Sequence, residues 1–200
     1  MPRDYKMRKR AEARDLTRER ILQATMQLHD EQGVAPTTMA DIAKRAGVGQ
    51  ATVSRHFQSL SNLIQTCGMH VWVEMQPPVP DAAPAVFAGI ETTDGRLAKL
   101  VDELDAFYGR GALRLRLASR DRDLLPELNG FLTAVEAGVE ALVREALANS
   151  GEPEPAIRMA IMLTSFPVWS GFNQLGLPAS KLAPLKLKVL ECGIKAARQP

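Results

Sequence analysis

The sequence predicts an all-α protein, with an N-terminal three-helix helix-turn-helix domain and a C-terminal helical domain. Apolar residues recur at helical spacing almost throughout the chain, and the strict alternation typical of strands is rare. Two short helical segments flank a glycine-containing turn at residues 47–49, the arrangement of a helix-turn-helix. A proline-rich stretch at residues 77–84 separates this region from a long helical remainder.

The first predicted helix runs from about Asp15 to Gln32 and ends at Gly33, where a left-handed residue costs least. Its apolar face is expected to pack into a core, and the helical spacing places Ile21, Leu22, Thr25, Leu28 and His29 on it. A histidine on such a face is interpreted as a packed side chain, with a chemical role as the alternative.

The next two helices form the predicted helix-turn-helix. Thr38 and Asp41 have the spacing of a capping box, which predicts a helix start at residue 39. This helix ends at Gly47, and the following helix is expected from about Gln50 to Phe57. A fourth helix is predicted to start with Ser59 or Ser61 as its cap and to reach residue 75.

Beyond the proline-rich stretch, helical segments are predicted near residues 94–108, 111–119, 124–149, 154–175 and 181–198. Pro167 is expected to kink or split the fourth of these, because proline removes a backbone hydrogen bond. Five arginines between residues 110 and 122 are interpreted as a solvated face paired with Asp121, Asp123 and Glu127, with a helix that links a ligand pocket to the N-terminal domain as the alternative.

Composition favours a folded cytoplasmic protein. No apolar run approaches the roughly 20 residues that span a membrane, and the charged N-terminus lacks the pattern of a signal peptide. Cys67 and Cys192 are isolated, so they are expected to be reduced thiols. The hydrolase, metalloprotease, phosphate-loop and dinucleotide motifs are all missing, which argues against an enzyme and predicts neither a cofactor nor a metal.

The charge is unevenly distributed along the chain. Residues 1–64 carry 11 Lys or Arg against 7 Asp or Glu, whereas the remainder carries 14 against 16. A basic end on a near-neutral body favours contact with phosphates, because their neutralisation releases condensed counterions.

Residues 41–57 resemble the DNA-binding segment of TetR-family regulators. The resemblance begins at Ile21-Leu22 in the preceding helix and ends near Leu63-Ile64, so it covers about residues 17–65. Residues 49–55 also resemble the recognition helix of the LacI family. The TetR interpretation is preferred because an amphipathic helix precedes the motif, and because the remainder is too short and too helical for a LacI-type body.

The resemblance implies that residues 50–57 lie in the major groove of DNA. Gln50 and Arg55 are the predicted base readers, and Ala51 is placed to touch a thymine methyl. The predicted phosphate contacts are Thr38, Thr52, Ser54 and His56, with helix capping as an equal alternative for Thr38. Ser54 stands where the family usually has tyrosine, and Leu60-Ser61 where it usually has Lys-Glu. The basic arm at Arg3 to Arg14 is therefore hypothesised to supply compensating contacts to phosphates or to the minor groove.

The resemblance also implies three segments: a basic arm (1–14), a DNA-binding domain (15–64), and an effector-binding and dimerisation domain (65–200). The expected function is a homodimeric regulator, most simply a repressor, that binds a palindromic operator and is released by a small, largely apolar effector. Dimerisation is expected through the last two helices. Candidate effector-binding residues are Phe107, Tyr108, Phe131, Met162, Phe166, Trp169 and Asn173, although packing in the core is the favoured alternative for each of them taken singly. An enzyme and a protein-binding helical adaptor are the alternatives.

Overall fold

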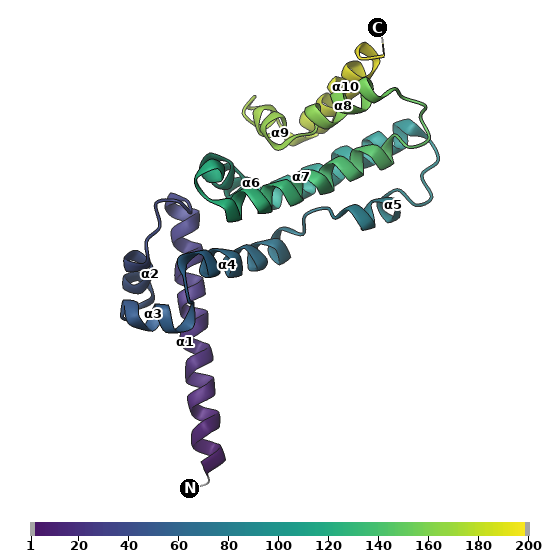
Figure 1. Ribbon diagram of the computed structural model, residues 1–200. Coiled ribbons are helices and arrows are strands. Elements are labelled where there is room, and N and C mark those ends of the chain that lie inside the picture. The colour runs from purple at the N-terminus through teal and green to yellow at the C-terminus, as the bar shows by residue number, and fades with distance from the viewer. Residues whose placement is uncertain (1–2, 199–200) are drawn as a thin grey trace. The chain divides into compact units, whose positions relative to one another are not determined.

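The computed structural model describes residues 3–198, and these are helical in most of their length with no strand among them. The all-α prediction is therefore confirmed. The elements are α1 (Arg3–Gln32), α2 (Met39–Ala46), α3 (Gln50–His56), α4 (Leu60–Met75), α5 (Ala83–Val86), α6 (Thr93–Asp121), α7 (Pro126–Ala146), α8 (Glu154–Leu163), α9 (Phe166–Asn173) and α10 (Ala179–Ala196) (Figure 1). Two short 3₁₀ turns, Pro80–Ala82 and Arg122–Leu124, precede α5 and α7.

The chain divides into two compact units. The first comprises the residues up to Val73 together with Arg116–Gly130, and the second comprises Glu74–Leu115 together with the residues from Phe131 onward. The first unit thus contains α1, α2, α3 and most of α4, but also the segment that joins α6 to α7. Its core is built mainly from the first 67 residues.

The core of the first unit consists of side chains that are almost completely buried. Ile21 and Leu22 come from α1, Ile42 from α2, Val53 from α3, and Leu63 from α4. Helix α1 packs against α2, α2 against α3, and α3 against α1 (Figure 1). Burying such side chains is the dominant favourable contribution to folding.

Two helices differ in extent from the prediction. Helix α1 begins at Arg3, about 12 residues earlier than expected, so the basic arm is a continuation of this helix. Helix α6 is a single element where two segments were expected, because Gly111 does not break the helix. Because Gly111 has no β-carbon, the Met75 side chain packs directly against the helix at this position.

The predicted effect of Pro167 is confirmed. The segment from residue 154 is split into α8 and α9, and Pro167 lies in the first turn of α9. The N–H groups of a first turn have no acceptor within the helix, so the missing N–H of Pro167 removes no helical hydrogen bond. Helices α8 and α10 then pack along each other in the second unit.

Candidate nucleic-acid interface

The turn between α2 and α3 is fixed by backbone geometry. Gly47 ends α2 in the left-handed conformation with φ 65°, and the N–H of Val48 donates to the carbonyl of Ala43 at 3.0 Å. Val53 at the centre of α3 and Phe57 at its end are completely buried. These contacts fix the face that α3 turns toward the core, and so they also fix the face that it leaves outside.

The outer face of α3 carries most of the predicted DNA-binding residues. Gln50, Ala51, Ser54 and Arg55 are exposed, whereas Thr52 and His56 are half-buried. The guanidinium of Arg55 donates to the hydroxyl oxygen of Thr52 at 3.0 Å. Thr52 therefore holds the Arg55 side chain, in addition to the phosphate contact predicted for it. The contacts of all these side chains to DNA stay predictions.

Thr38 caps α2 as its spacing predicts. Its hydroxyl oxygen accepts from the backbone N–H of Asp41 at 3.2 Å, and the Asp41 carboxylate accepts from the Thr38 N–H at 3.1 Å. The Thr38 hydroxyl also donates to this carboxylate at 2.6 Å, and these hydrogen bonds lower the pKa of Asp41. Capping is thus formed, and a phosphate contact from the exposed Thr38 stays a prediction.

Two contacts of α1 hold the helix-turn-helix in place. Glu31 accepts both guanidinium nitrogens of Arg45 at 2.7 and 2.8 Å, which joins α1 to α2 and lowers the pKa of Glu31. The Arg18 guanidinium lies 4.9 Å from the centre of the Phe57 ring. Arg45 is therefore a structural side chain and is not simply solvated.

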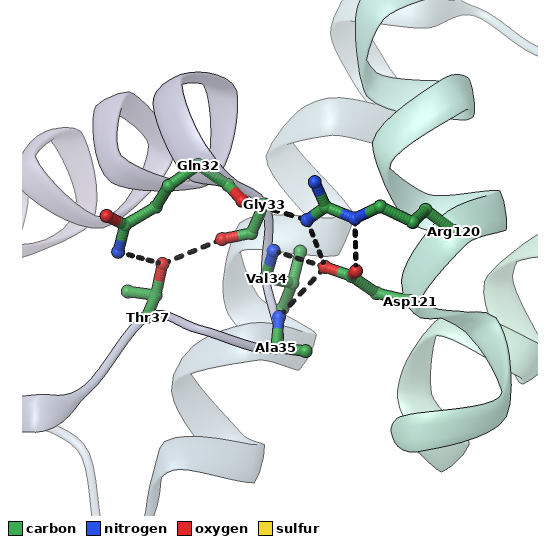
Figure 2. Close-up of polar contacts among 7 residues, drawn as sticks. All are labelled: Gln32, Gly33, Val34, Ala35, Thr37, Arg120 and Asp121. Atoms are coloured by element: carbon green, nitrogen blue, oxygen red, sulfur yellow. Dashed lines mark hydrogen bonds and ion pairs between the residues drawn. The ribbon is translucent and has the colours of Figure 1, made fainter.

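The turn after α1 is held by the last two residues of α6 (Figure 2). The Asp121 carboxylate is 4% exposed and accepts the backbone N–H groups of Val34 at 2.9 Å and Ala35 at 3.0 Å. Arg120 donates to this carboxylate at 2.7 Å and to the carbonyl of Gln32 at 2.8 Å. The hydrogen bond from Arg120 is the largest cause that lowers the pKa of Asp121, and the two backbone donors add to it.

Glycine is required at the centre of this contact. Gly33 has φ 100°, and a β-carbon there would collide with the Arg120 and Asp121 side chains. Its carbonyl accepts the hydroxyl of Thr37 at 2.7 Å (Figure 2). We call the contact of Arg120 and Asp121 with residues 32–35 the turn anchor.

The expectation of a solvated arginine face on α6 holds only in part. Arg120 is exposed and pairs with Asp121 as expected, whereas other arginines of this helix reach partners that were not expected. Arg120 belongs to the turn anchor, Arg110 donates to the carbonyls of Met75 and Gln76, and Arg114 pairs with Glu74. Charge spacing along one helix does not reveal which distant backbone atoms a side chain reaches.

His29 lies on the inner side of α1 as predicted, and its ring is mostly buried. Its Nε2 atom has no hydrogen-bond partner, and burial lowers the pKa of His29 to about 4. The imidazole is therefore neutral in the folded protein near neutral pH.

The predicted basic arm is helical. Side chains from residue 7 onward are exposed there, and Arg8 pairs with Glu12 at 3.3 Å while Arg14 lies 3.8 Å from Asp15. Part of its positive charge is thus paired within the helix. Contact of the arm with DNA stays a prediction.

Four of the predicted effector-binding residues come together in the second unit. Phe107 and Tyr108 are buried on α6, and the Tyr108 ring lies 5.5 Å from that of Phe166 and 5.3 Å from that of Trp169. The Tyr108 hydroxyl donates to the carbonyl of Thr164 at 3.0 Å, and burial raises the Tyr108 pKa.

The other three candidates lie differently. Phe131 is half-buried, Asn173 is exposed, and Met162 on α8 is 52% exposed. Met162 thus lies on the surface of its unit and not in an enclosed site.

A cavity in the second unit adds residues that the sequence did not suggest. Its walls come from α6, α8, α9 and α10, and its lining comprises Val101, Leu104, Asp105, Leu163, Thr164, Trp169, Phe172, Lys186, Val189 and Leu190. Of the predicted residues, only Trp169 lines it. Asp105 and Lys186 are 81 positions apart in the sequence, so spacing gave no signal that they pair.

Residues 3–198 contain no group of three or more His, Cys, Asp or Glu side chains arranged to hold a metal. None of their helices combines the length and the apolar character needed to cross a membrane.

Comparison with known protein families gives a match within the first unit. Residues 21–67 match the model of the bacterial regulatory proteins of the tetR family. No curated protein sequence matches the chain.

Solved structures match over most of the chain. HlyIIR, a hemolysin II transcriptional regulator, has a TM-score of 0.60 at 17% identity and covers 94% of this chain and 99% of its own. A putative TetR-family regulator from Mesorhizobium loti has a TM-score of 0.57 at 19% identity, covering 92% and 97%. LfrR from Mycobacterium smegmatis, solved in complex with proflavine, has a TM-score of 0.53 at 22% identity, covering 88% and 96%. At these identities, the likeness shows a shared fold.

Proposed function

We propose that this chain is a TetR-family transcriptional regulator, and that it is a homodimeric repressor that binds a palindromic operator and releases it when a small, largely apolar effector binds. The family is one of DNA-binding regulators and not of enzymes. The observation that carries the proposal is the division of α3 into two faces. Val53 and Phe57 are fully buried, while Gln50 and Arg55 are exposed on a rigid helix.

The exposed face of α3 has the chemistry needed to read base edges. Gln50 can bond to the N6 and N7 of adenine, and Arg55 to the O6 and N7 of guanine. Thr52 holds the Arg55 guanidinium at 3.0 Å, which lowers the entropy lost on binding. Ser54 stands where the family usually has tyrosine, and its short side chain reaches less far toward a phosphate. Base contacts therefore supply a larger share of the affinity.

Homodimerisation is supported by the surface of the last helices. Met162, Leu175 and Leu177 are 52%, 56% and 39% exposed, and α9 contains no fully buried residue. Paired recognition helices are also required to read two half-sites of a palindrome. We therefore propose that α8, α9 and α10 form the dimer surface, and that the dimer acts in the cytoplasm, where operator DNA lies.

The proposed response to effector is a population shift. A ligand that binds one arrangement of the dimer more tightly moves the equilibrium toward it, by no more than its difference in affinity. The aromatic cluster around Tyr108 and the neighbouring cavity support binding of an apolar ligand. LfrR, which shares the fold, has been solved with proflavine bound.

The test is an electrophoretic mobility shift of the purified dimer with palindromic fragments from the region upstream of its own gene. The double variant Gln50→Ala plus Arg55→Ala should weaken specific binding by about 100-fold, since each base-edge contact is worth roughly 1–3 kcal/mol. Gln27→Ala plus Arg116→Ala removes an exposed glutamine of α1 and an exposed arginine of α6, outside α2, α3 and the proposed dimer surface, and should leave binding unchanged. Specific binding retained by the folded double variant would contradict the assignment of α3.

A further inference from the structure

The first half of α1 extends beyond the core of the helix-turn-helix. Residues 7–16 are all exposed, whereas Ile21 and Thr25 of the same helix are completely buried. Figure 1 shows this N-terminal part of α1 running past α2 and α3 as an unbroken helix. We call residues 7–16 the α1 extension. Because it contributes nothing to the core, its faces are free for contact with a partner.

Two arginines of the α1 extension continue the buried side of α1. Arg10 and Arg14 lie about one helical turn apart, and Ile21 and Thr25 follow Arg14 at spacings of 7 and 11 residues. Since an α-helix turns roughly 100° per residue, these four positions lie within about 60° of one another. Arg10 and Arg14 therefore lie on the side of α1 that packs into the helix-turn-helix, beyond the point where this core ends.

The acidic residues of this part of α1 lie on the opposite side. Glu12, Asp15 and Glu19 recur at spacings of three and four residues, which places them together at roughly 150° from the two arginines. Asp15 approaches Arg14 only to 3.8 Å, at 73% exposure of the arginine, and such an exposed pair contributes little. The positive charge of this face is thus left largely uncompensated.

The cationic side of α1 is also the side that meets α3. Arg18, about one turn after Arg14, is exposed, and its guanidinium lies 4.9 Å from the centre of the Phe57 ring at the end of α3. Arg14 and Arg10 follow Arg18 toward the N-terminus at successive turns. They therefore extend outward from the end of α3, where the backbone of a duplex bound by that helix would run.

We propose that the α1 extension binds DNA in its helical form, and that Arg10 and Arg14 contact backbone phosphates beside the major groove that α3 enters. The inference rests on the proposed function and deepens it, because it adds a second contact of the same domain with the operator. Guanidinium groups bind phosphates by charge-assisted hydrogen bonds, and each neutralised phosphate releases condensed counterions. This contact contributes affinity, whereas sequence is read by α3.

The helical form of the α1 extension distinguishes phosphate contacts from contacts in the minor groove. The minor groove of B-DNA is only about 6 Å wide, whereas an α-helix with its side chains is about 10–12 Å across. An intact helix is therefore too wide to enter that groove. Along the backbone, in contrast, the helix presents both arginines to phosphates without breaking any of its own hydrogen bonds.

The test is the salt dependence of operator binding by the full-length protein, measured by fluorescence anisotropy with the fragment that the wild type shifts. Arg10→Gln plus Arg14→Gln removes the proposed contacts, of which a dimer would lose four. Since each contact contributes about 0.9 to the slope of log K against log salt concentration, the slope should become shallower by about 3 to 4. Affinity near 0.15 M salt should fall by roughly tenfold or more.

Lys9→Gln plus Arg20→Gln is the matched control. Both residues are exposed, and their spacing of 11 places them on one face of α1, roughly 110° from that of Arg10 and Arg14. The control removes the same charge from the same helix, and glutamine keeps the helix propensity. It should therefore change the slope by less than about 1. Equal changes of slope in the two double variants would overturn the proposal, as would no change in either.

Base pairs beside the operator separate phosphate contacts from minor-groove contacts. Replacing A·T pairs that flank each half-site by G·C pairs should change the affinity of the wild type and of Arg10→Gln plus Arg14→Gln by the same factor, because phosphates carry no base identity. A loss of affinity confined to the wild type would place the arginines in the minor groove and overturn the proposal.

Failure of the proposed function has a different signature. Binding that depends on Gln50 and Arg55 but not on Arg10 and Arg14 leaves the proposed regulator standing and overturns only the role of the α1 extension. Binding that depends on Arg10 and Arg14 but has no sequence preference supports the phosphate contacts and contradicts the assignment of α3. No binding to any fragment contradicts both.

Discussion

The helix-turn-helix unit and the last three helices of the chain are stabilised in contrasting ways. Around α1 to α4, Ile21, Leu22, Ile42, Val53 and Phe57 are all at most 1% exposed. In α8 to α10, the buried positions are two alanines, a lysine, a leucine and an isoleucine, and α9 has none. Large apolar side chains such as Met162 remain exposed there.

The difference indicates what each region still lacks. The helix-turn-helix closes its own apolar core, so its outer face is left free for DNA without loss of stability. The last three helices leave apolar surface and a polar pair incompletely covered, which is the state expected of a region that meets a partner subunit or a ligand. The comparison predicts that the same kind of substitution lowers the free energy of unfolding by different amounts in the two regions.

The largest expected difference is between two aromatic truncations. Phe57→Ala should lower the free energy of unfolding by about 4 kcal/mol, the usual cost for a fully buried phenylalanine. Trp169→Ala should lower it by only about 2 kcal/mol in the ligand-free protein, because that ring is half-buried. Urea titration, with hydrogen exchange of α1–α3 and α8–α10 amides to locate the change, would measure both. Equal losses of unfolding free energy in the two variants would contradict the proposed difference between the two regions.

The same contrast explains what could be predicted from the sequence. The helix-turn-helix was predictable because its determinants are local: the capping box of Thr38 and Asp41 is formed, and Gly47 ends α2. Pro167 likewise acts on its own helix. Each of these signals lies within a few residues of the feature that it predicts.

The missed features depend on residues far apart in the sequence. Asp121 is 87 positions from the Val34 N–H it accepts, and Lys186 is 81 positions from Asp105. Which backbone or side chain such a group meets is decided by packing of the helices, and periodicity carries no information about it. Gly33 was expected only as a helix cap, whereas the closeness of Arg120 also requires a glycine there.

The turn anchor tests whether the helix-turn-helix unit is as self-contained as its core suggests. Asp121→Ala should lower the free energy of unfolding of this unit by about 3 kcal/mol, because the N–H groups of Val34 and Ala35 lose a charged acceptor and Arg120 loses its partner. Asp121→Asn keeps an acceptor oxygen and should cost about half as much.

Hydrogen exchange of the Val34 and Ala35 amides reports on the turn anchor directly. Both should exchange faster in Asp121→Ala. Asp123→Ala removes an exposed carboxylate two residues away and should leave them unchanged. If the Asp121→Ala protein keeps both its stability and this protection, the first 67 residues stabilise the unit without help from α6, and the contrast between the regions becomes sharper.

His29 produces the smallest expected effect near neutral pH, because its contribution changes only as the pH falls. Burial lowers its pKa from 6.5 to about 4, so at intermediate pH the unfolded chain binds a proton that the folded chain does not. Stability from the neutral imidazole is therefore fully present above pH 6.5 and is lost as the pH falls toward 4, by about 3 kcal/mol. His29→Leu removes this titration together with the unpartnered Nε2. The difference in unfolding free energy between the variant and the wild type should shift in favour of the variant as the pH falls through this window, when both are measured by urea titration at matched ionic strength. A difference that stays constant across the window would mean that the imidazole is protonated equally in both states, and that this part of the unit is more open to water than the core around it.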